Sequence, residues 1–277
     1  MKRAENQGLD QYTTIRIGGI AKRLLMPESV DELADLVKAE KPKYFLGGGS
    51  NLLIADREFD LVVVLRDFNP TFVHEGDGVF RVGASVRLQQ LINRVNEMGY
   101  GGIEYLYSVP GLVGGAIVMN AGRGRKYNQT ISDYILSVDI LRDGMPMTLG
   151  RDECRFSHRN SIFRNSSDLV TGCTLRFPQI SPEDSAGRKR ERIEHCKAVQ
   201  DASKPNFGTV FCESNSRIMD YARKRKLGSK VHFSGKTANW LLNEGGNYED
   251  ALAAIKKVEL LHKLAFQKCR REVIVWD

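Results

Sequence analysis

Two clusters of glycine and other small residues constrain the fold of this chain more than any other feature of its sequence. Residues 47–51 read Gly-Gly-Gly-Ser-Asn, and residues 108–122 include the run Pro-Gly-Leu-Val-Gly-Gly-Ala. A residue without a Cβ permits tight turns, and consecutive backbone N–H groups in such a loop can converge on an anion. Because a strand-like run precedes each cluster, the sequence predicts two loops whose backbones approach a ligand or another segment closely.

The first cluster matches none of the common nucleotide-binding signatures. It has no Gly-Lys-Ser/Thr ending, as a Walker A loop would, and it is not a GxGxxG pattern. A phosphate cradle completed by the side chains of Ser50 and Asn51 and a tight surface turn are both open at this stage. The second cluster allows two interpretations as well, a surface for a flat ligand and a tightly packed buried loop.

The rest of the chain alternates between strand-like and helix-like patterns. Residues 13–26 alternate loosely like a strand, and residues 29–39 carry apolar side chains at helical spacing. The residues between 181 and 204 begin with Ser-Pro-Glu-Asp, which is typical of a helix N-terminus, so a domain boundary is expected near residues 178–182. The same patterns predict further strands at 44–46, 61–65, 79–82, 135–142, 169–177 and 272–276 and further helices at 88–98 and 248–266.

Composition excludes several classes of protein. The 277 residues include 42% hydrophobic and 27% charged residues, which excludes a disordered, collagenous or coiled-coil chain. The net charge of +7 favours an anionic ligand. The basic stretches 188–192 and 223–226 lack interleaved aromatic residues, so a solvated surface is favoured there over nucleic-acid binding.

The cysteines and the N-terminus predict a cytoplasmic protein. The five cysteines are widely spaced and form no CxxC pair, so neither disulfides nor a metal site is expected. The first ten residues are polar, and no apolar window approaches the roughly 18 residues that a membrane helix needs. We therefore expect no membrane association.

A series of motifs resembles one family of enzymes over nearly the whole chain. The motifs lie, in order, at residues 14–21, 46–53, 110–122, 159–163, 205–211, 238–243 and 272–273. Their order and content resemble the UDP-N-acetylenolpyruvoylglucosamine reductase family, also called UDP-N-acetylmuramate dehydrogenase. The short C-terminal part resembles the compact subtype of this family or a divergent paralogue.

The resemblance implies an α+β fold and a flavoenzyme. It implies a two-subdomain FAD-binding region of the vanillyl-alcohol-oxidase/PCMH type over residues 1–180, with subdomains at about 12–70 and 71–180. A smaller α+β substrate-binding domain would follow at 181–277. NADPH would reduce FAD, which would in turn reduce the enol ether of UDP-N-acetylglucosamine enolpyruvate to UDP-N-acetylmuramate for peptidoglycan synthesis. The partner implied is thus a small nucleotide sugar, and the protein is expected to be a monomer or a weak homo-oligomer.

The site residues follow from the positions that match the family's motifs. Negative charge develops on the substrate carboxylate when hydride adds to the β-carbon, and Arg159 and Glu272 match the residues that face it. Thr209 matches the general acid that protonates the α-carbon, and His158 and Asn239 match substrate-binding positions. FAD-binding positions are Gly47, Gly48, Gly49, Ser50, Asn51, Leu52, Pro110, Gly111, Gly114, Gly115, Ala116, Asn120, Ala121 and Gly122.

The departures from the family's pattern lie on the substrate side. His158 replaces a tyrosine, Thr209 a serine and Thr237 a histidine, and a basic loop at 123–128 replaces a shorter one. Cys212 is either a small apolar filler or a thiol near the active site. Two other functions therefore stay open, a paralogous FAD oxidoreductase acting on a different unsaturated or hydroxy acid and a non-catalytic flavin or nucleotide binder.

Overall fold

The computed structural model describes residues 1–123 and 129–277, and the chain divides into two compact units. Unit 1 comprises residues 1–3, 25–48 and 61–196, and unit 2 comprises residues 4–24, 49–60 and 197–277. Each unit is thus assembled from segments that are distant in the sequence. The functional division of the chain into residues 1–180 and 181–277 stays a prediction.

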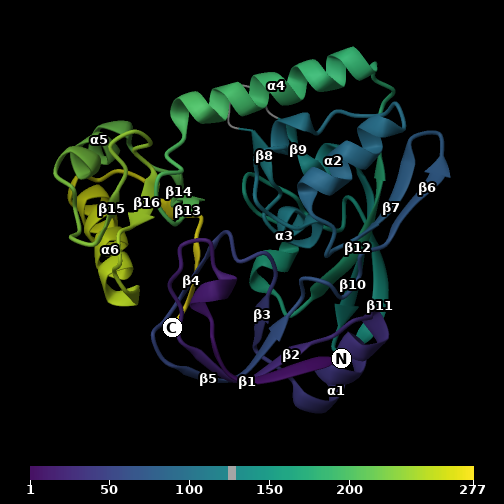
Figure 1. Ribbon diagram of the computed structural model, residues 1–277, viewed down its shortest axis with the longest axis horizontal. Helices are drawn as coiled ribbons and strands as arrows, with labels where there is room; N and C mark the ends of the chain where they lie inside the picture. The colour runs from purple at the N-terminus through teal and green to yellow at the C-terminus, as the bar shows by residue number, and fades with distance from the viewer. Residues whose placement is uncertain (124–128) are drawn as a thin grey trace. The chain divides into compact units, whose positions relative to one another are not determined.

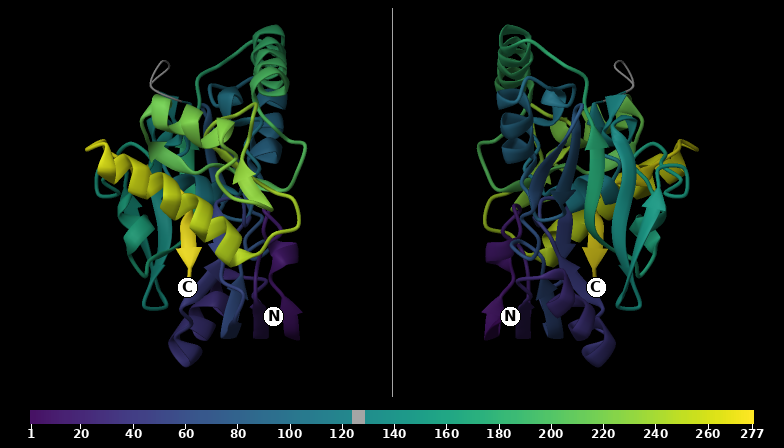
Figure 2. Two further views of the ribbon diagram at one scale, coloured as in Figure 1. Left: turned by 90° about the vertical axis from the view of Figure 1, so that its left-hand side faces the viewer. Right: turned by 90° about the vertical axis from the view of Figure 1, so that its right-hand side faces the viewer.

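A five-stranded antiparallel sheet organises unit 1, in the order β11-β10-β12-β7-β6 (Figure 2, right). Its largest fully buried side chains include Phe80 and Phe177, whose ring centroids are 5.9 Å apart. The strands are β6 (Phe72–Gly76), β7 (Val79–Gly83), β10 (Ile135–Arg142), β11 (Met145–Gly150) and β12 (Leu169–Arg176), and a short pair is formed by β8 (Gly122–Arg123) and β9 (Gln129–Thr130).

Two helices of unit 1 begin at serine side-chain caps. The Ser29 side chain accepts a hydrogen bond from the backbone N–H of Glu32, which fixes the start of α1. The Ser181 hydroxyl does the same for Asp184 at the start of α4, as the Ser-Pro-Glu-Asp motif predicts. The helices are α1 (Val30–Glu40), α2 (Leu88–Glu97), α3 (Val113–Val118) and α4 (Pro182–Val199), of which the last three residues belong to unit 2, with short 3₁₀ helices η2 (Glu104–Leu106), η3 (Ile131–Asp133) and η4 (Ile162–Asn165).

A four-stranded sheet has the order β1-β2-β5-β3. Three of its strands, β1 (Lys2–Gly8), β2 (Ile20–Met26) and β5 (Glu58–Val64), cross the division between the units, whereas β3 (Tyr44–Leu46) belongs to unit 1. Within unit 1, β3 and β5 are parallel and pair from Tyr44 with Val62 to Leu46 with Val64. The chain that leaves β3 enters the first glycine cluster directly.

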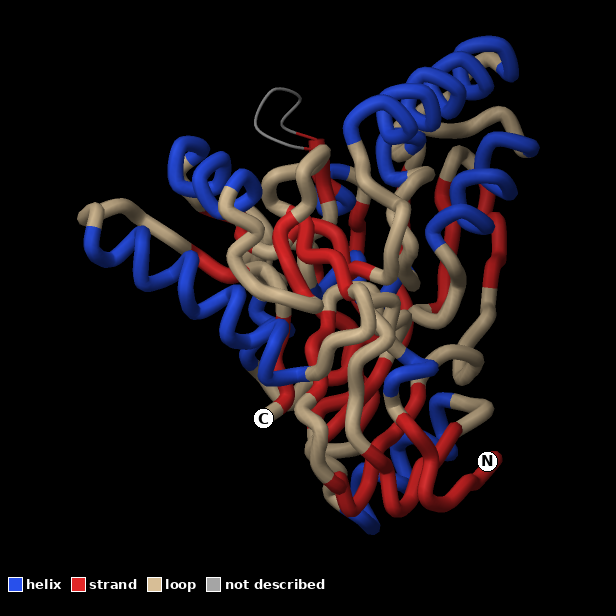
Figure 3. The backbone as a smooth tube through the Cα atoms, turned by 60° about the vertical axis from the view of Figure 1, so that its left-hand side comes forward, coloured by secondary structure: helices blue, strands red, loops and turns tan. Residues whose placement is uncertain are grey.

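Unit 2 contains short strands and two helices that pack on them (Figures 1 and 3). The rings of Phe211 and Phe233 stack in its core with centroids 6.4 Å apart. Its strands are β4 (Leu52–Ile54), β13 (Asn206–Thr209), β14 (Phe211–Glu213), β15 (Val231–Phe233), β16 (Trp240–Asn243), β17 (Arg270–Arg271) and β18 (Ile274–Trp276), and its helices are η1 (Asp10–Tyr12), α5 (Ser216–Lys224) and α6 (Tyr248–Leu264).

Two expected strands are wrong in part. Residues 13–19 form a turn followed by irregular backbone, in which the Thr13 hydroxyl donates to the Ile17 carbonyl oxygen at 2.9 Å and accepts from the Ile17 N–H. The expected strand at 272–276 is interrupted, since the N–H groups of Glu272 and Val273 both donate to the Val210 carbonyl oxygen. In addition, β1 lies in a polar segment where the sequence shows no strand pattern.

Asp143 and Gly144 form a hairpin turn. It joins β10 and β11 with φ values of 52° and 75°, as a type I′ hairpin requires. Among the described residues, no helix is long and apolar enough to cross a bilayer.

Candidate active site

The first glycine loop presents bare backbone at its start. A Cβ added at Gly47 would meet no atom within 4 Å, and one at Gly48 would lie at ordinary contact distance, 3.6 Å, from the Gly111 Cα atom. Both glycines belong to unit 1, so unit 1 brings the start of the first cluster to the second cluster. The two glycine loops therefore lie in contact with each other within unit 1.

The end of the same loop belongs to unit 2 and is held by that unit's own backbone. Gly49 has φ +67°, and a Cβ there would lie 1.9 Å from the Tyr12 carbonyl oxygen. The Asn51 amide donates to the Glu272 carbonyl oxygen at 3.2 Å, and Leu52 is buried in β4. This glycine is therefore required by the chain itself, and Asn51 connects the loop to a predicted catalytic position.

The second glycine loop begins α3 and is fixed by backbone hydrogen bonds. The N–H of Gly114 donates to the Ala84 carbonyl oxygen, and that of Val113 donates to Val86, each at 2.9 Å. A Cβ at Gly114 would lie 2.9 Å from the Ala84 Cβ atom, whereas a Cβ at Gly115 would meet no atom within 4 Å. The two neighbouring glycines thus differ. The absence of a side chain at Gly114 lets α3 pack closely against Ala84, whereas Gly115 leaves its backbone face open.

In α3 and the segment that follows it, three predicted FAD-binding residues have buried side chains. Asn120 is 3% exposed, and its Nδ2 donates to the Ser157 carbonyl oxygen at 3.0 Å. Ala116 and Ala121 are buried. These three predicted FAD-binding side chains face the protein, so any contact that they make with a cofactor has to come from their backbone.

Arg159 lies in the same unit, at a turn with φ 53°. One of its terminal nitrogens donates to the Gly122 carbonyl oxygen at 2.8 Å, and its own carbonyl oxygen accepts from Arg164. His158, beside it in the turn, is exposed. Unit 1 therefore brings a guanidinium group to the end of the predicted flavin-lining segment.

Unit 2 brings together the other predicted catalytic and substrate-binding residues. The backbone N–H of Val210, next to Thr209, donates to the Asn239 carbonyl oxygen at 2.9 Å, and the Val210 carbonyl oxygen accepts from Glu272 at 2.8 Å. The Asn239 amide bonds both backbone groups of Phe211, accepting from its N–H and donating to its carbonyl oxygen. Asn239 therefore positions the strand after Thr209.

The five cysteines, Cys212 among them, form no disulfide with one another. The Cys212 thiol donates to the Arg270 carbonyl oxygen at 3.3 Å. Burial raises the pKa of the Cys269 thiol to about 11. Among the described residues, no cluster of three His, Cys, Asp or Glu side chains could hold a metal ion.

Sequence reasoning missed Tyr105, which lies in η2 just before the second glycine cluster. Its side chain is 7% exposed, and its hydroxyl has no hydrogen-bond partner among the described residues. Burial raises the pKa of the phenol, and the Arg159 charge opposes that increase. An aromatic residue next to a glycine cluster is the only signal in the sequence that would have indicated it.

The basic loop expected to replace a shorter one lies mainly at 124–128, outside the described residues.

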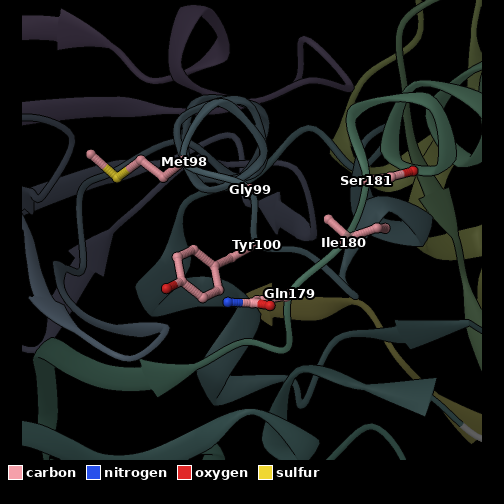
Figure 4. Close-up of a pocket in the computed structure, with 6 residues that line it drawn as sticks. All are labelled: Met98, Gly99, Tyr100, Gln179, Ile180 and Ser181. Atoms are coloured by element: carbon pink, nitrogen blue, oxygen red, sulfur yellow. The ribbon is translucent and has the colours of Figure 1, made fainter.

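A pocket of about 470 Å³ in unit 1 lies elsewhere, where α2 ends and the chain approaches α4 (Figure 4). None of the predicted site residues lines it. Its lining residues are Met98, Gly99, Tyr100, Gln179, Ile180 and Ser181.

The open faces at Gly47 and Gly115 fit a cofactor with a phosphate group and a flat ring system. A family model described as an FAD binding domain matches residues 21–149, which include both glycine clusters. The chain is an FAD-dependent oxidoreductase with an α+β fold and an FAD-binding region.

Comparison with individual proteins narrows this class. The chain is 31% identical over 263 residues to UDP-N-acetylenolpyruvoylglucosamine reductase of Syntrophotalea carbinolica, covering 91% of this chain and 86% of that protein. It is 29% identical over 281 residues to the enzyme of the same name from Thermotoga petrophila, covering 97% and 96%. The crystal structure of UDP-N-acetylenolpyruvylglucosamine reductase from Thermus caldophilus superposes with a TM-score of 0.81 at 27% identity, covering 100% and 98%. The chain belongs to the UDP-N-acetylenolpyruvoylglucosamine reductase family.

Proposed function

We propose that this chain reduces the enol ether of UDP-N-acetylglucosamine enolpyruvate to UDP-N-acetylmuramate in the cytoplasm, with NADPH as the reductant. The observation that carries the proposal is the hydrogen bond from Arg159 to the Gly122 carbonyl oxygen. It holds a permanent cation beside the segment that would line the flavin. A fixed cation at that position suits a reaction in which negative charge develops on a carboxylate.

Backbone groups of both glycine loops would hold the cofactor. Gly47 and Gly48 would offer N–H groups to its pyrophosphate, and the open face at Gly115 would lie against its ring system. When bound, FAD would supply the redox chemistry of the reaction, the transfer of hydride from NADPH to the β-carbon of the enolpyruvyl group.

The side chains would then stabilise charge and supply a proton. Arg159 and Glu272 would face the substrate carboxylate as negative charge develops on it, and the Thr209 hydroxyl would donate a proton to the α-carbon. Thr209 is half-buried at the end of β13, where it pairs with Trp240. The hydrogen bonds from Asn239 to Phe211 would keep this part of the chain in register.

The test follows the flavin spectrum in FAD-loaded protein without oxygen. NADPH should bleach the flavin absorbance, and the enolpyruvyl UDP-sugar should restore it while UDP-N-acetylmuramate forms. Bleaching without reoxidation by this sugar would contradict the proposed substrate. Reoxidation by another unsaturated acid would then support the paralogous oxidoreductase, and failure to bind FAD would contradict the whole proposal.

A further inference from the structure

Helix α4 is attached to unit 1 by polar contacts instead of an apolar face. Of its 18 residues, only Ser185 and Cys196 are buried. Yet the basic stretch that the sequence predicts to be a solvated surface makes specific contacts within unit 1. The Lys189 Nζ donates to the Asn93 side chain at 3.3 Å, and Arg188 lies 3.8 Å from the Glu104 carboxylate.

Two further α4 side chains meet at a single hydroxyl group. The Arg192 Nε donates to the Ser108 Oγ at 2.8 Å, and the Cys196 Sγ donates to the same oxygen at 3.0 Å. Arg192 and Cys196 are one helical turn apart, so both project from the same face of α4. A serine oxygen has two lone pairs, and these two donors use both of them.

Ser108 is the first residue of the second glycine loop, residues 108–122. On one side of it, the Tyr107 carbonyl oxygen accepts from the Gln89 side chain at 3.0 Å. On the other side, the Gly111 carbonyl oxygen accepts from the Leu88 N–H at 3.0 Å. Residues 107 and 111 are thus hydrogen-bonded to α2, and Ser108, which lies between them, is hydrogen-bonded to α4.

Glu104, one turn before Ser108, strengthens the same attachment. Its carboxylate is 1% exposed and accepts hydrogen bonds from the Gly102 N–H and from the Asn96 amide. These bonds fix the buried carboxylate in η2, and the 56% exposed Arg188 side chain forms a solvent-screened ion pair with it at 3.8 Å. Helix α4 is therefore attached to both the helix that precedes the loop and the first residue of the loop.

We propose that Arg192 and Ser108 are positioning residues for FAD, which hold residues 108–111 in the conformation that binds the flavin. This inference rests on the proposed placement of FAD against the second glycine loop. Without the hydrogen bond, the loop entrance would sample more conformations in the protein without cofactor. Binding of FAD would then have to order it, which lowers affinity without removing a contact to the cofactor.

The test measures the dissociation constant of FAD by titration of the protein after removal of FAD. Ser108→Ala and Arg192→Gln should each weaken FAD binding about tenfold, the effect of one charge-assisted hydrogen bond. Because Ser108→Ala already removes the bond from Arg192, the double variant should bind FAD no more weakly than Ser108→Ala alone. Amide hydrogen exchange at residues 107–111 in the cofactor-free protein should be faster in both variants.

The control is Arg190→Gln, which removes the same charge from an exposed position on α4. It should leave FAD affinity within twofold of the original protein. Equal losses in Arg190→Gln and Arg192→Gln would overturn the proposal, because net charge would then explain both. A lower melting temperature with unchanged FAD affinity in the Ser108 and Arg192 variants would overturn it as well, because α4 would then contribute stability alone.

Gly115→Ala separates this inference from the proposed flavin placement, because it adds a methyl group to the open face. If Gly115→Ala weakens FAD binding and Ser108→Ala and Arg192→Gln do not, the positioning role is overturned and the flavin placement is supported. If none of the three weakens FAD binding, both are overturned.

Discussion

Within the first glycine cluster, Gly49 differs from Gly47 in what surrounds it, and within the second cluster Gly114 differs from Gly115 in the same way. A Cβ at Gly49 or Gly114 would come within 3 Å of other atoms of the chain, whereas a Cβ at Gly47 or Gly115 would meet none within 4 Å. The first two glycines are required by folding, and the second two leave backbone exposed. A cluster of glycines therefore combines a packing requirement with a binding surface, and substitution by alanine separates the two.

The largest effect is expected from Gly49→Ala. Its positive φ and the short distance to the Tyr12 carbonyl oxygen should together lower the free energy of unfolding by about 4 kcal/mol. Urea unfolding of the cofactor-free protein measures this. Gly47→Ala is the matched control and should change stability by less than about 1 kcal/mol. Equal losses in the two variants would remove the distinction between the two kinds of glycine.

Arg159→Ala should have the next largest effect, on the rate of the reaction. Loss of a fixed cation that faces developing charge lowers kcat by about 100-fold to 1,000-fold. Arg155→Ala is a suitable control, because Arg155 is exposed and also has a positive φ, of 46°. Steady-state kinetics with the enolpyruvyl UDP-sugar provides the comparison, and similar rates in the two variants would argue against a catalytic role for Arg159.

Gly115→Ala should weaken FAD binding while leaving the fold intact. The new methyl group would occupy the space where the flavin is proposed to lie, so the dissociation constant should rise at least about tenfold. Alanine is a better helix former than glycine, so the cofactor-free protein should be up to about 1 kcal/mol more stable.

Gly114→Ala should show the opposite pattern to Gly115→Ala, since its methyl group would crowd Ala84. We expect it to lower the free energy of unfolding by about 1 to 3 kcal/mol. If Gly115→Ala destabilises the protein and leaves FAD affinity unchanged, the open face does not bind the cofactor.

The smallest effect is expected at Cys212, for which the sequence left two roles open. Its thiol donates to the Arg270 carbonyl oxygen, and a serine hydroxyl could make the same bond. Cys212→Ser should therefore keep kcat within about threefold of the original protein. Such a change corresponds to less than about 1 kcal/mol in the activation free energy. A loss of more than about 100-fold in this variant would instead indicate a catalytic thiol.

Local sequence patterns predicted most of the elements that carry the site. Helix α2 begins at Leu88 and β10 covers Ile135–Arg142, as the apolar spacing indicates. The strand at residues 13–19 was predicted wrongly, because alternation is also compatible with a turn in which Thr13 bonds the backbone. The sequence predicts a solvated surface for the basic stretch in α4 and misses the hydrogen bond from Arg192 to Ser108. Such a polar contact leaves no periodic pattern of apolar residues.

The sequence by itself determined the family, through motifs that follow one another over nearly the whole chain, and with it the FAD-dependent chemistry. Only the tertiary structure decided which glycine is needed for packing and which exposes its backbone. It also showed that the Asn120 and Asn239 side chains bond the protein's own backbone, and that α4 holds the entrance to the second glycine loop. The physical reason is that these distinctions depend on which atoms from distant parts of the chain lie within about 4 Å, the range of van der Waals contact and hydrogen bonding.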